Sequence, residues 1–572
     1  MPKVLLRRGP SNGQPNNVVK GLDRLLEEGQ RTRPHFSQCW VMPCIPQGAR
    51  TLEEYSVGNA RIKIMSLAGE VAALYHITPW EYHLSSEVLS TINGVIERVV
   101  STPPRTIDSY PEATKEYVVA MAYDELRKAL RKSQTVLGLS AQGTEDLIWS
   151  LCQVVTRYTI GYGLLEILLS DKKLEDIYID APAGSNPIHV TFSGLTGTNN
   201  LMRCDTNIIA SENEVTAFVS RMKHQSGRPF SEAFPTMETD VGGFEARATV
   251  VGLPLSPNGT ALALRRHSST PWTLLKMAHS GTIDALTAGL ISFLIDGRST
   301  ILVCGPRGAG KSSMLGAIMF EFPPNQRILT IEDTAELPVR RMQSIGFKVQ
   351  SLLVQQRLGE SQEEKTEEAL RVSLRLGESA IILGEVRGRE AKVLYDSMRT
   401  GKAGSSVLGT MHGDSAKSVY ERVVHDLGIA KEAFNATDAV ITMGLTRPGG
   451  SQRPLRKMID LSECSRLGPG QFRTLVELGP EGKMMNRLDG HSELISRIAA
   501  AWGIEYEEAL ENIQARAGIR KALLHYAKAN GEEYLSPEWA AKANLFLWEK
   551  VERGEKDFKQ VVKDFQTFLE RG

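Results

Sequence analysis

The chain has 572 residues, of which 41% are hydrophobic and 23% are charged, a composition typical of folded globular domains. Lys plus Arg and Asp plus Glu both number 67, so the formal net charge is zero and gives no support to a nucleic-acid or anionic-membrane partner. The first residues lack a signal peptide and no apolar run is long enough to cross a bilayer, so we expect a cytoplasmic protein that meets a membrane only through a partner.

Six cysteines are spread along the chain, and none belongs to a Cys-x-x-Cys pair. A zinc ribbon needs two such pairs to place four thiolates around the metal. His35, Cys39 and Cys44 lie close together in the sequence, which leaves a zinc site as the less favoured interpretation. Reduced, partly buried thiols are the expected state.

Two domains and a leader segment are predicted in the first half of the chain. Residues 1–50 begin with a Pro-, Asn- and Gly-rich stretch and are expected to be flexible. Residues 51–170 are predicted to form a mainly helical domain with helices over 85–100, 112–130 and 145–170, preceded by a strand pattern at 61–65. Residues 171–275 are predicted to form an α+β (PAS-like) domain, with strands at 174–180, 188–192, 244–251 and 261–265 and a helix at 212–225.

The second half is predicted to contain an ATPase domain at 276–480 and a helical region at 481–572. Short apolar strands alternate with helices after residue 299, which indicates a parallel sheet covered on both faces. The strands are expected at 301–304, 328–331, 380–383 and 405–411, and the helices at 311–322, 367–376, 390–399 and 416–427.

A glycine-rich loop follows the first of these strands. It reads Gly305, Pro306, Arg307, Gly308, Ala309, Gly310, Lys311 and Ser312, with Ser313 next. Glycines let several backbone N–H groups point inward at phosphate oxygens, and the following helix adds its positive dipole end. Lys311 is expected to reach the β- and γ-phosphates and Ser312 to bind Mg²⁺, so the loop predicts ATP with Mg²⁺ as the bound cofactors.

Acidic residues end two further strands at the same predicted sheet edge, where open α/β sheets bind their ligands. Glu332 and Glu336 follow one strand, and Glu385 follows another. Glu385 is the preferred acid for orienting the attacking water, with the Glu332 pair as the alternative. His412 ends a third strand, where it is expected to sense the γ-phosphate or to orient Glu385.

Together these motifs resemble the type II/type IV secretion-system ATPase superfamily, and its archaeal branch in particular. The resemblance comprises the phosphate loop, an acidic box at 330–336, a second Walker motif at 383–387 with Gly-Glu in place of Asp-Glu, and a histidine box at 409–414. Residues 386–391 and 410–415 are closer to archaeal than to bacterial members. One departure is Leu-Gly-Glu-Ser at 376–379, where relatives carry Arg-Pro-Asp or Asp-Pro-Asp.

The resemblance implies a RecA-like P-loop ATPase domain preceded by an α+β domain and a mainly helical N-terminal domain, with a helical C-terminal tail. It further implies a homo-hexameric motor that closes on ATP and drives a membrane platform protein of a secretion, pilus or archaellum machine. Arginines of the α+β domain complete the site in such proteins, and the matching positions are Arg247, Arg265 and Arg266, with Arg228 as a further candidate.

Two other functions are weighed against this motor. A RecA-like nucleic-acid translocase is not favoured by the zero net charge and a sequence pI near 7.2, and no direct nucleic-acid contact is expected. A non-hydrolysing, nucleotide-gated scaffold is opposed by the intact Lys311, Ser312 and Glu385. Which filament or cargo is served, and whether the motor assembles or retracts, stays open.

Overall fold

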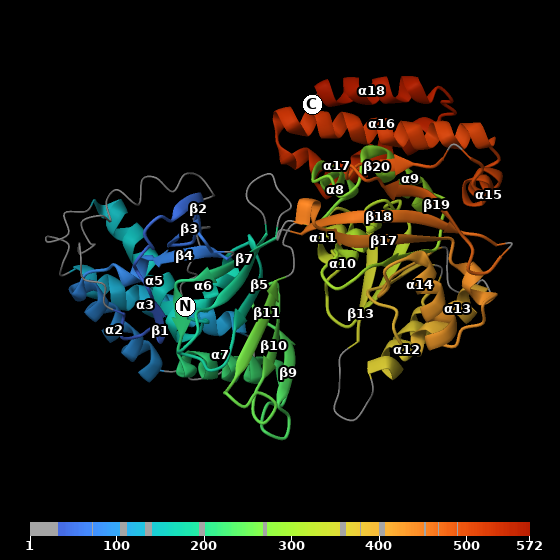
Figure 1. Ribbon diagram of the computed structural model, residues 1–572. Helices are drawn as coiled ribbons and strands as arrows, with labels where there is room; N and C mark the ends of the chain where they lie inside the picture. The colour runs from blue at the N-terminus through green and yellow to red at the C-terminus, as the bar shows by residue number, and fades with distance from the viewer. Residues whose placement is uncertain are drawn as a thin grey trace. The chain divides into compact units, whose positions relative to one another are not determined.

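The computed structural model describes residues 33–70, 72–102, 111–131, 140–193, 201–266, 271–354, 362–377, 379–399, 406–450, 454–466, 468–488 and 490–571. The chain divides into two compact units, the first formed by Met1–Thr196 with Leu201–Ser269 and the second by Gly197–Asn200 with Thr270–Gly572 (Figure 1). The mixed α/β class predicted from the sequence is confirmed. Among the described residues, no helix combines the length and the apolar composition that a bilayer span requires.

A nine-stranded mixed sheet runs through the first unit in the order β2-β3-β4-β7-β6-β5-β11-β10-β9. Its strands are β2 (Arg50–Val57), β3 (Ala60–Ser66), β4 (Ala73–Pro79), β5 (Leu174–Ile179), β6 (His189–Ser193), β7 (Leu201–Thr206), β9 (Thr236–Asp240), β10 (Ala246–Val251) and β11 (Ala261–Arg266). β1 (Cys39–Val41) and β8 (Ile208–Ala210) form a separate two-stranded antiparallel sheet that shares the same apolar core.

This sheet crosses the domain boundary expected at residue 170. β4 pairs in parallel with β7, with Ala73 opposite Cys204 and Tyr75 opposite Thr206. One apolar core contains side chains from both sides of the boundary, such as Ile62 and Leu264. The local alternation in the sequence predicts several of these strands, though not β7 or β9, and a pairing between residues about 130 positions apart leaves no local period.

The segment expected to be flexible at 1–50 contains β1, and residues 1–32 lie outside the described part of the chain. Cys39, in β1, is buried, whereas Cys44 is exposed. Across the described residues, no His, Cys, Asp and Glu side chains are grouped so as to hold a metal ion.

Five helices accompany the sheet among the described residues of the first unit: α2 (Ser86–Ser101), α3 (Pro111–Arg131), α5 (Ala141–Thr159), α6 (Leu165–Ser170) and α7 (Glu212–Ser226). α2, α3 and α5 pack around a core of their own. The single helix expected over 145–170 is wrong, because Gly163 has φ 56° and turns the chain between α5 and α6. A Cβ on Gly161 would lie 2.8 Å from the carbonyl oxygen of Arg157, which shows how tightly the chain folds back there.

The second unit contains another nine-stranded sheet, ordered β14-β13-β15-β16-β12-β17-β18-β19-β20. Its strands are β12 (Ile301–Cys304), β13 (Arg327–Glu332), β14 (Lys348–Leu353), β15 (Ala380–Leu383), β16 (Val407–Met411), β17 (Ala439–Thr446), β18 (Leu455–Cys464), β19 (Phe472–Leu478) and β20 (Met484–Asn486). The six from β14 to β17 are parallel, as predicted, but β18 to β20 continue antiparallel. The sequence analysis named no strand in this antiparallel part, whose hairpin connections need no crossover helix.

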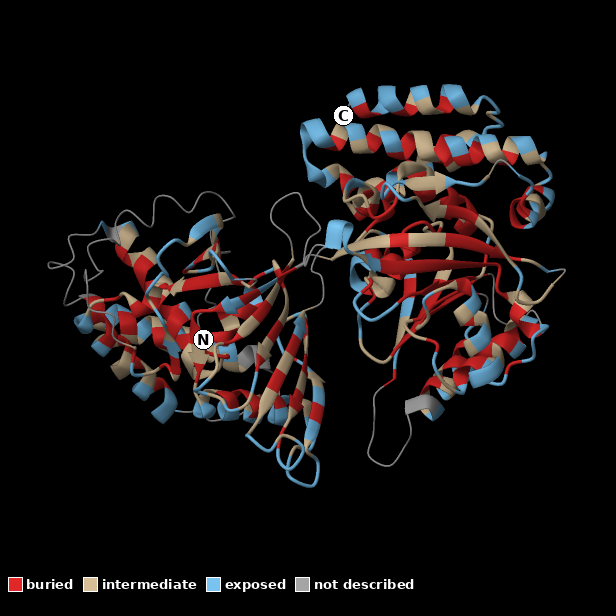
Figure 2. Ribbon diagram, in the orientation of Figure 1, coloured by how far each residue is buried: buried red, intermediate tan, exposed pale blue. Residues whose placement is uncertain are grey.

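Helices cover both faces of the parallel part of this sheet, and Figure 2 shows its central strands buried. Side chains alternate along β12, so Ile301 and Val303 enter one core and Leu302 and Cys304 enter the other. The first core is shared with α8 (Leu274–His279), α9 (Ala285–Asp296), α10 (Lys311–Met319) and α11 (Val339–Ser344), and the second with α12 (Gln362–Ser373), α13 (Glu390–Arg399) and α14 (Ala416–Glu421).

Four helices complete the second unit: α15 (Glu493–Trp502), α16 (Tyr506–Asn530), α17 (Pro537–Glu552) and α18 (Phe558–Arg571). In Figure 1, α16 and α18 lie side by side. α16 packs so closely on α9 that a Cβ on Gly289 would lie 2.7 Å from the backbone nitrogen of Ala517. The predicted C-terminal helices are confirmed, whereas β20 extends the sheet past residue 480.

A buried ion pair joins these helices to the end of α10. The Arg520 guanidinium, which is 3% exposed, binds the carboxylate of Glu321, just after α10. Asn544 of α17 donates to the same carboxylate at 2.8 Å. Removing one partner of such a pair leaves a buried charge without compensation.

We therefore expect Arg520→Met to lower the free energy of unfolding by about 3–5 kcal/mol. The matched control is Arg341→Met, which breaks the exposed pair with Glu538 and should cost less than about 1 kcal/mol. Urea unfolding followed by tryptophan fluorescence measures both. Equal losses in the two variants would contradict a special role for burial at Arg520.

Candidate nucleotide-binding site

The phosphate loop connects β12 to α10 in the conformation that its glycines permit. Gly305, Gly308 and Gly310 have φ of 154°, 81° and 92°, a region that residues with a Cβ rarely adopt. A Cβ on Gly305 would also lie 2.4 Å from the carbonyl oxygen of Met443. The loop and the start of α10 therefore present backbone N–H groups as a concave surface suited to phosphate oxygens.

Lys311 is the first residue of α10, and its ammonium group lies against the loop. Its Nζ donates to the carbonyl oxygens of Gly305 at 3.0 Å and Pro306 at 3.1 Å. Burial lowers the pKa of Lys311, and the carboxylates of Glu385 and Glu336 oppose that change. The residues present thus fit a polyphosphate, which would offer this ammonium group stronger acceptors than two neutral carbonyls.

The other loop residues differ in exposure. Pro306 and Arg307 are exposed, Ala309 is buried, and Ser312 and Ser313 are half-buried in the first turn of α10. Ser312 is positioned in the chain where its hydroxyl would hold Mg²⁺ beside a bound nucleotide.

Glu385 and His412 meet at the carboxyl edge of the sheet. Glu385 Oε1 lies 3.2 Å from His412 Nε2, and its Oε2 lies 3.8 Å from Arg387 Nη1. Burial lowers the pKa of His412, the positive charge of Lys311 lowers it further, and Glu385 raises it. The imidazole is therefore mainly neutral at pH 7 and suited to a hydrogen bond with the carboxyl group of Glu385.

The strand register explains why His412 lies beside the phosphate loop. β12 pairs in parallel with β16, with Cys304 opposite Met411. The next residue of each strand is therefore Gly305 on one side and His412 on the other. The structure thus brings the phosphate loop together with Glu385 and His412, which follow Lys311 by about 75 and 100 residues in the sequence.

Glu332 is buried at the end of β13 and supports the loop that follows it. Its Oε1 accepts the backbone N–H groups of Glu336 at 2.9 Å and Leu337 at 2.8 Å, while no partner is found for its Oε2 among the described residues. Burial raises the pKa of Glu332 to about 7, and the two backbone hydrogen bonds oppose this change. Glu336, by contrast, is exposed.

The candidate arginines all belong to the first unit, and each has a partner within that unit. Arg247 pairs with Glu238 of the neighbouring strand, and Arg265 donates to Asp176 Oδ1 at 3.0 Å. Arg266 donates to the carbonyl oxygen of Asp171. Arg265 is exposed and Arg266 is half-buried, in keeping with the opposite directions expected for adjacent strand residues. Their action on nucleotide stays a prediction, as does that of Arg228, whose guanidinium donates to the Glu238 carbonyl.

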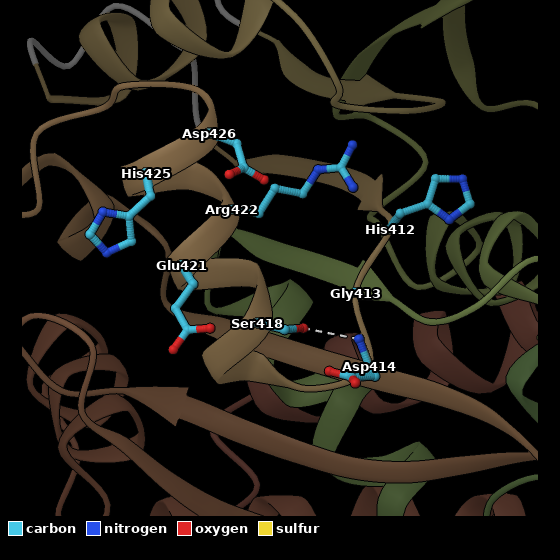
Figure 3. Close-up of a pocket in the computed structure, with 8 residues that line it drawn as sticks. All are labelled: His412, Gly413, Asp414, Ser418, Glu421, Arg422, His425 and Asp426. Carbon is cyan, nitrogen blue, oxygen red and sulfur yellow. Dashed lines mark hydrogen bonds between the residues drawn. The ribbon is translucent and has the colours of Figure 1, made fainter.

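Two arginines near the loop had no signal in the sequence. Arg456 of β18 donates from Nε to the carbonyl oxygen of Gly308 at 3.0 Å. It reaches the loop because β18 returns antiparallel beside β17, a pairing that no local motif predicts. Arg422 lies beyond His412, in a cavity of about 460 Å³ (Figure 3). The cavity is lined by His412, Gly413, Asp414, Ser418, Glu421, Arg422, His425 and Asp426.

A strand, a glycine-bent loop and a helix that begins with Lys311 define a P-loop nucleotide-binding site. The family described as "Type II/IV secretion system protein" matches residues 167–462, slightly more than half of the chain. The chain belongs to this type II/IV secretion-system ATPase family, which confirms the resemblance.

Relatives come from bacteria and archaea. A "Putative conjugal transfer protein" of Mycobacterium tuberculosis is 30% identical over 286 residues, which cover 49% of this chain and 77% of the relative. An uncharacterized protein of Methanocaldococcus jannaschii is 28% identical over 291 residues, which cover 50% of this chain and 38% of the relative. The solved structure of the Yersinia pseudotuberculosis ATPase DotB is 14% identical, with a TM-score of 0.38, and covers 66% of this chain and 92% of its own.

The burial of Glu332 predicts a pH dependence of stability. Its pKa of about 7 in the folded state lies above its ordinary value of 4.5, so the native state binds more protons between these limits. The stability that the neutral carboxyl group contributes is complete below pH 4.5 and is lost as the pH rises through about 7. Since each pH unit of difference is worth about 1.4 kcal/mol, wild type should lose about 2–3 kcal/mol relative to Glu332→Gln between pH 5 and pH 8.

Urea unfolding of both proteins at several pH values measures this difference. Glu336→Gln is the control, since that carboxylate is exposed and should leave the pH profile unchanged. Parallel profiles for wild type and Glu332→Gln would show that Glu332 stays ionised in the folded protein.

Proposed function

We propose that this protein hydrolyses ATP and acts as the hexameric, cytoplasmic motor of a type II/type IV secretion, pilus or archaellum assembly machine. The observation that carries the proposal is the meeting of Lys311, Glu385 and His412 at one sheet edge, with Glu385 and His412 3.2 Å apart. Membership of the family supports ATP hydrolysis and a motor role. The partner we propose is a polytopic membrane platform protein, through which the motor lies at the inner face of the cell membrane.

The chain's own groups would divide the chemistry in a simple way. The loop N–H groups and Lys311 would hold the phosphates of ATP, and Ser312 would hold Mg²⁺, which supplies positive charge to the phosphate oxygens when bound. Glu385 would accept a hydrogen bond from the attacking water and orient it toward the terminal phosphate. His412 would keep the Glu385 carboxylate in place through the contact at its Oε1.

Hydrolysis and binding assays on the full chain test this proposal. Lys311→Ala should lose nearly all turnover, because it removes the ammonium group that lies against the phosphate loop. Glu385→Gln should bind ATP like the wild type but hydrolyse it at least about 100-fold more slowly, since the amide keeps the shape and removes the charge that orients water. Lys483→Ala is the control, with wild-type turnover expected, because Lys483 is 82% exposed and pairs with the similarly exposed Glu481.

Wild-type turnover in Lys311→Ala would refute the proposed site. If Glu332→Gln or Glu336→Gln instead binds ATP tightly without hydrolysis, the acidic box supplies the catalytic acid. Hydrolysis that DNA or RNA stimulates, and that falls with salt, would favour a nucleic-acid translocase instead.

The proposed arginines are tested by mixing two inactive proteins. If Arg247, with Arg265 or Arg266, acts on the nucleotide of a neighbouring copy, Arg247→Ala mixed with Lys311→Ala should regain part of the wild-type hydrolysis. Mixed rings then contain some sites with every required residue. An arginine at a departing phosphate is worth roughly 10³–10⁵ in rate, so even a few restored sites are detectable. No recovery, with mixed rings confirmed by native mass spectrometry, would exclude action in trans.

A further inference from the structure

The cavity beside His412 contains an arginine that the proposed mechanism does not use. Arg422 is half-buried, and its guanidinium points toward His412 in Figure 3. Within the described part of the chain, its side chain makes no hydrogen bond and no ion pair within 4.0 Å. A half-buried guanidinium without such contacts has five N–H donors available for a ligand.

The backbone at Arg422 is unusual. α14 ends at Glu421, and Arg422–Asp426 continue as a π-helical turn. A π-turn inside a helix changes the direction in which the next side chains project, and such turns occur often at functional sites. Ser418, Glu421, Arg422 and His425 all line the cavity, a spacing of three to four residues that is typical of one helical face.

Three acidic residues line the cavity, Asp414, Glu421 and Asp426, and in the described part of the chain none forms an ion pair with Arg422 within 4.0 Å. Asp414 accepts a hydrogen bond from the hydroxyl of Ser415 at 3.1 Å, and Glu421 lies 3.9 Å from Lys417 Nζ. In Figure 3, the side chain of Glu421 extends away from the side on which Arg422 and His412 face each other. The inner part of the cavity, between Arg422 and His412, contains a guanidinium and an imidazole, while Asp414, Glu421 and Asp426 add three carboxylates to the lining as a whole.

This inner part adjoins the phosphate loop. His412 lines the cavity and is the neighbour of Gly305 in the β12–β16 register. Burial, Lys311 and Arg422 all lower the pKa of His412, so its ring lies within the electrostatic influence of both cations. An anion that leaves Lys311 in the direction of His412 would meet Arg422 next.

We propose that Arg422 and His412 form a second phosphate site, which takes either inorganic phosphate after hydrolysis or the terminal phosphate of bound ATP. A guanidinium can meet two oxygens of such a group at once. A neutral imidazole has one N–H, so His412 can donate to a phosphate oxygen only in place of its contact with Glu385. The inference rests on the proposed nucleotide function. It is tested by the binding of phosphate and nucleotide, whereas the function is tested by ATP hydrolysis, so that one can be refuted without the other.

The experiment compares wild type, Arg422→Gln, Arg422→Lys and Lys431→Gln as full chains. Lys431→Gln removes one positive charge from an exposed residue paired with Glu432, outside the cavity. Equilibrium dialysis with radiolabelled inorganic phosphate, in the presence of ADP and Mg²⁺, measures the affinity for inorganic phosphate. Competition between ADP and a non-hydrolysable ATP analogue measures how much the terminal phosphate adds to the affinity for nucleotide.

If the site takes inorganic phosphate, Arg422→Gln should bind it about tenfold or more weakly, Arg422→Lys should keep part of the affinity, and Lys431→Gln should equal wild type. If it takes the terminal phosphate of ATP, Arg422→Gln should instead lose about tenfold in affinity for the ATP analogue relative to ADP. Both results support the site and distinguish its ligands.

Unchanged binding of both ligands in Arg422→Gln, or an equal loss in Lys431→Gln, would overturn the proposal. Phosphate binding by a wild type that hydrolyses no ATP would leave this site standing and refute the proposed function. Circular dichroism of each variant confirms that the fold is retained.

Discussion

The parallel pairing of β12 with β16 on one side and β17 on the other is the constraint on which the candidate site depends. Cys304 lies opposite Met411 in one pairing and opposite Thr442 in the other. Gly305 therefore leaves the sheet beside His412 and against the carbonyl of Met443, where a Cβ would not fit. A slip of one residue in either pairing would separate the loop from the histidine and reverse the faces of both strands.

Desolvation has the same effect on three charged groups at this edge. Burial lowers the pKa of Lys311 and of His412 and raises that of Glu332 to about 7, so each is moved toward its neutral form. Burial at this edge of the sheet therefore stabilises the neutral form of each group relative to the charged form. The negative oxygens of a bound polyphosphate would stabilise the ammonium form of Lys311 and so raise its pKa again.

The helix that begins with Lys311 is held at its other end by the C-terminal helices. Glu321 follows α10 and binds Arg520 of α16 and Asn544 of α17 in the core. Arg516, one turn earlier in α16, binds Asp296 at the end of α9. These helices are therefore part of the structural support of the loop, since the polar groups that join them to it are buried and hydrogen-bonded to one another.

The local sequence by itself determined the phosphate loop, the strand ends that carry Glu332, Glu385 and His412, and the C-terminal helices. These features depend on contiguous residues: glycines where φ is positive, apolar strands of four to six residues, and helical periodicity. The family resemblance, too, depends on the order of contiguous motifs along the chain.

Only the tertiary structure decided which distant strands pair and which side chains reach the site. The parallel pairing of β4 with β7 and the contact of Arg456 with Gly308 each join segments more than 100 residues apart. The π-turn that begins at Arg422 is likewise not revealed by helical periodicity. The physical reason is the same in each case: a local pattern specifies the conformation of a segment and its apolar face, whereas its partner is selected by packing and hydrogen bonding across the whole domain.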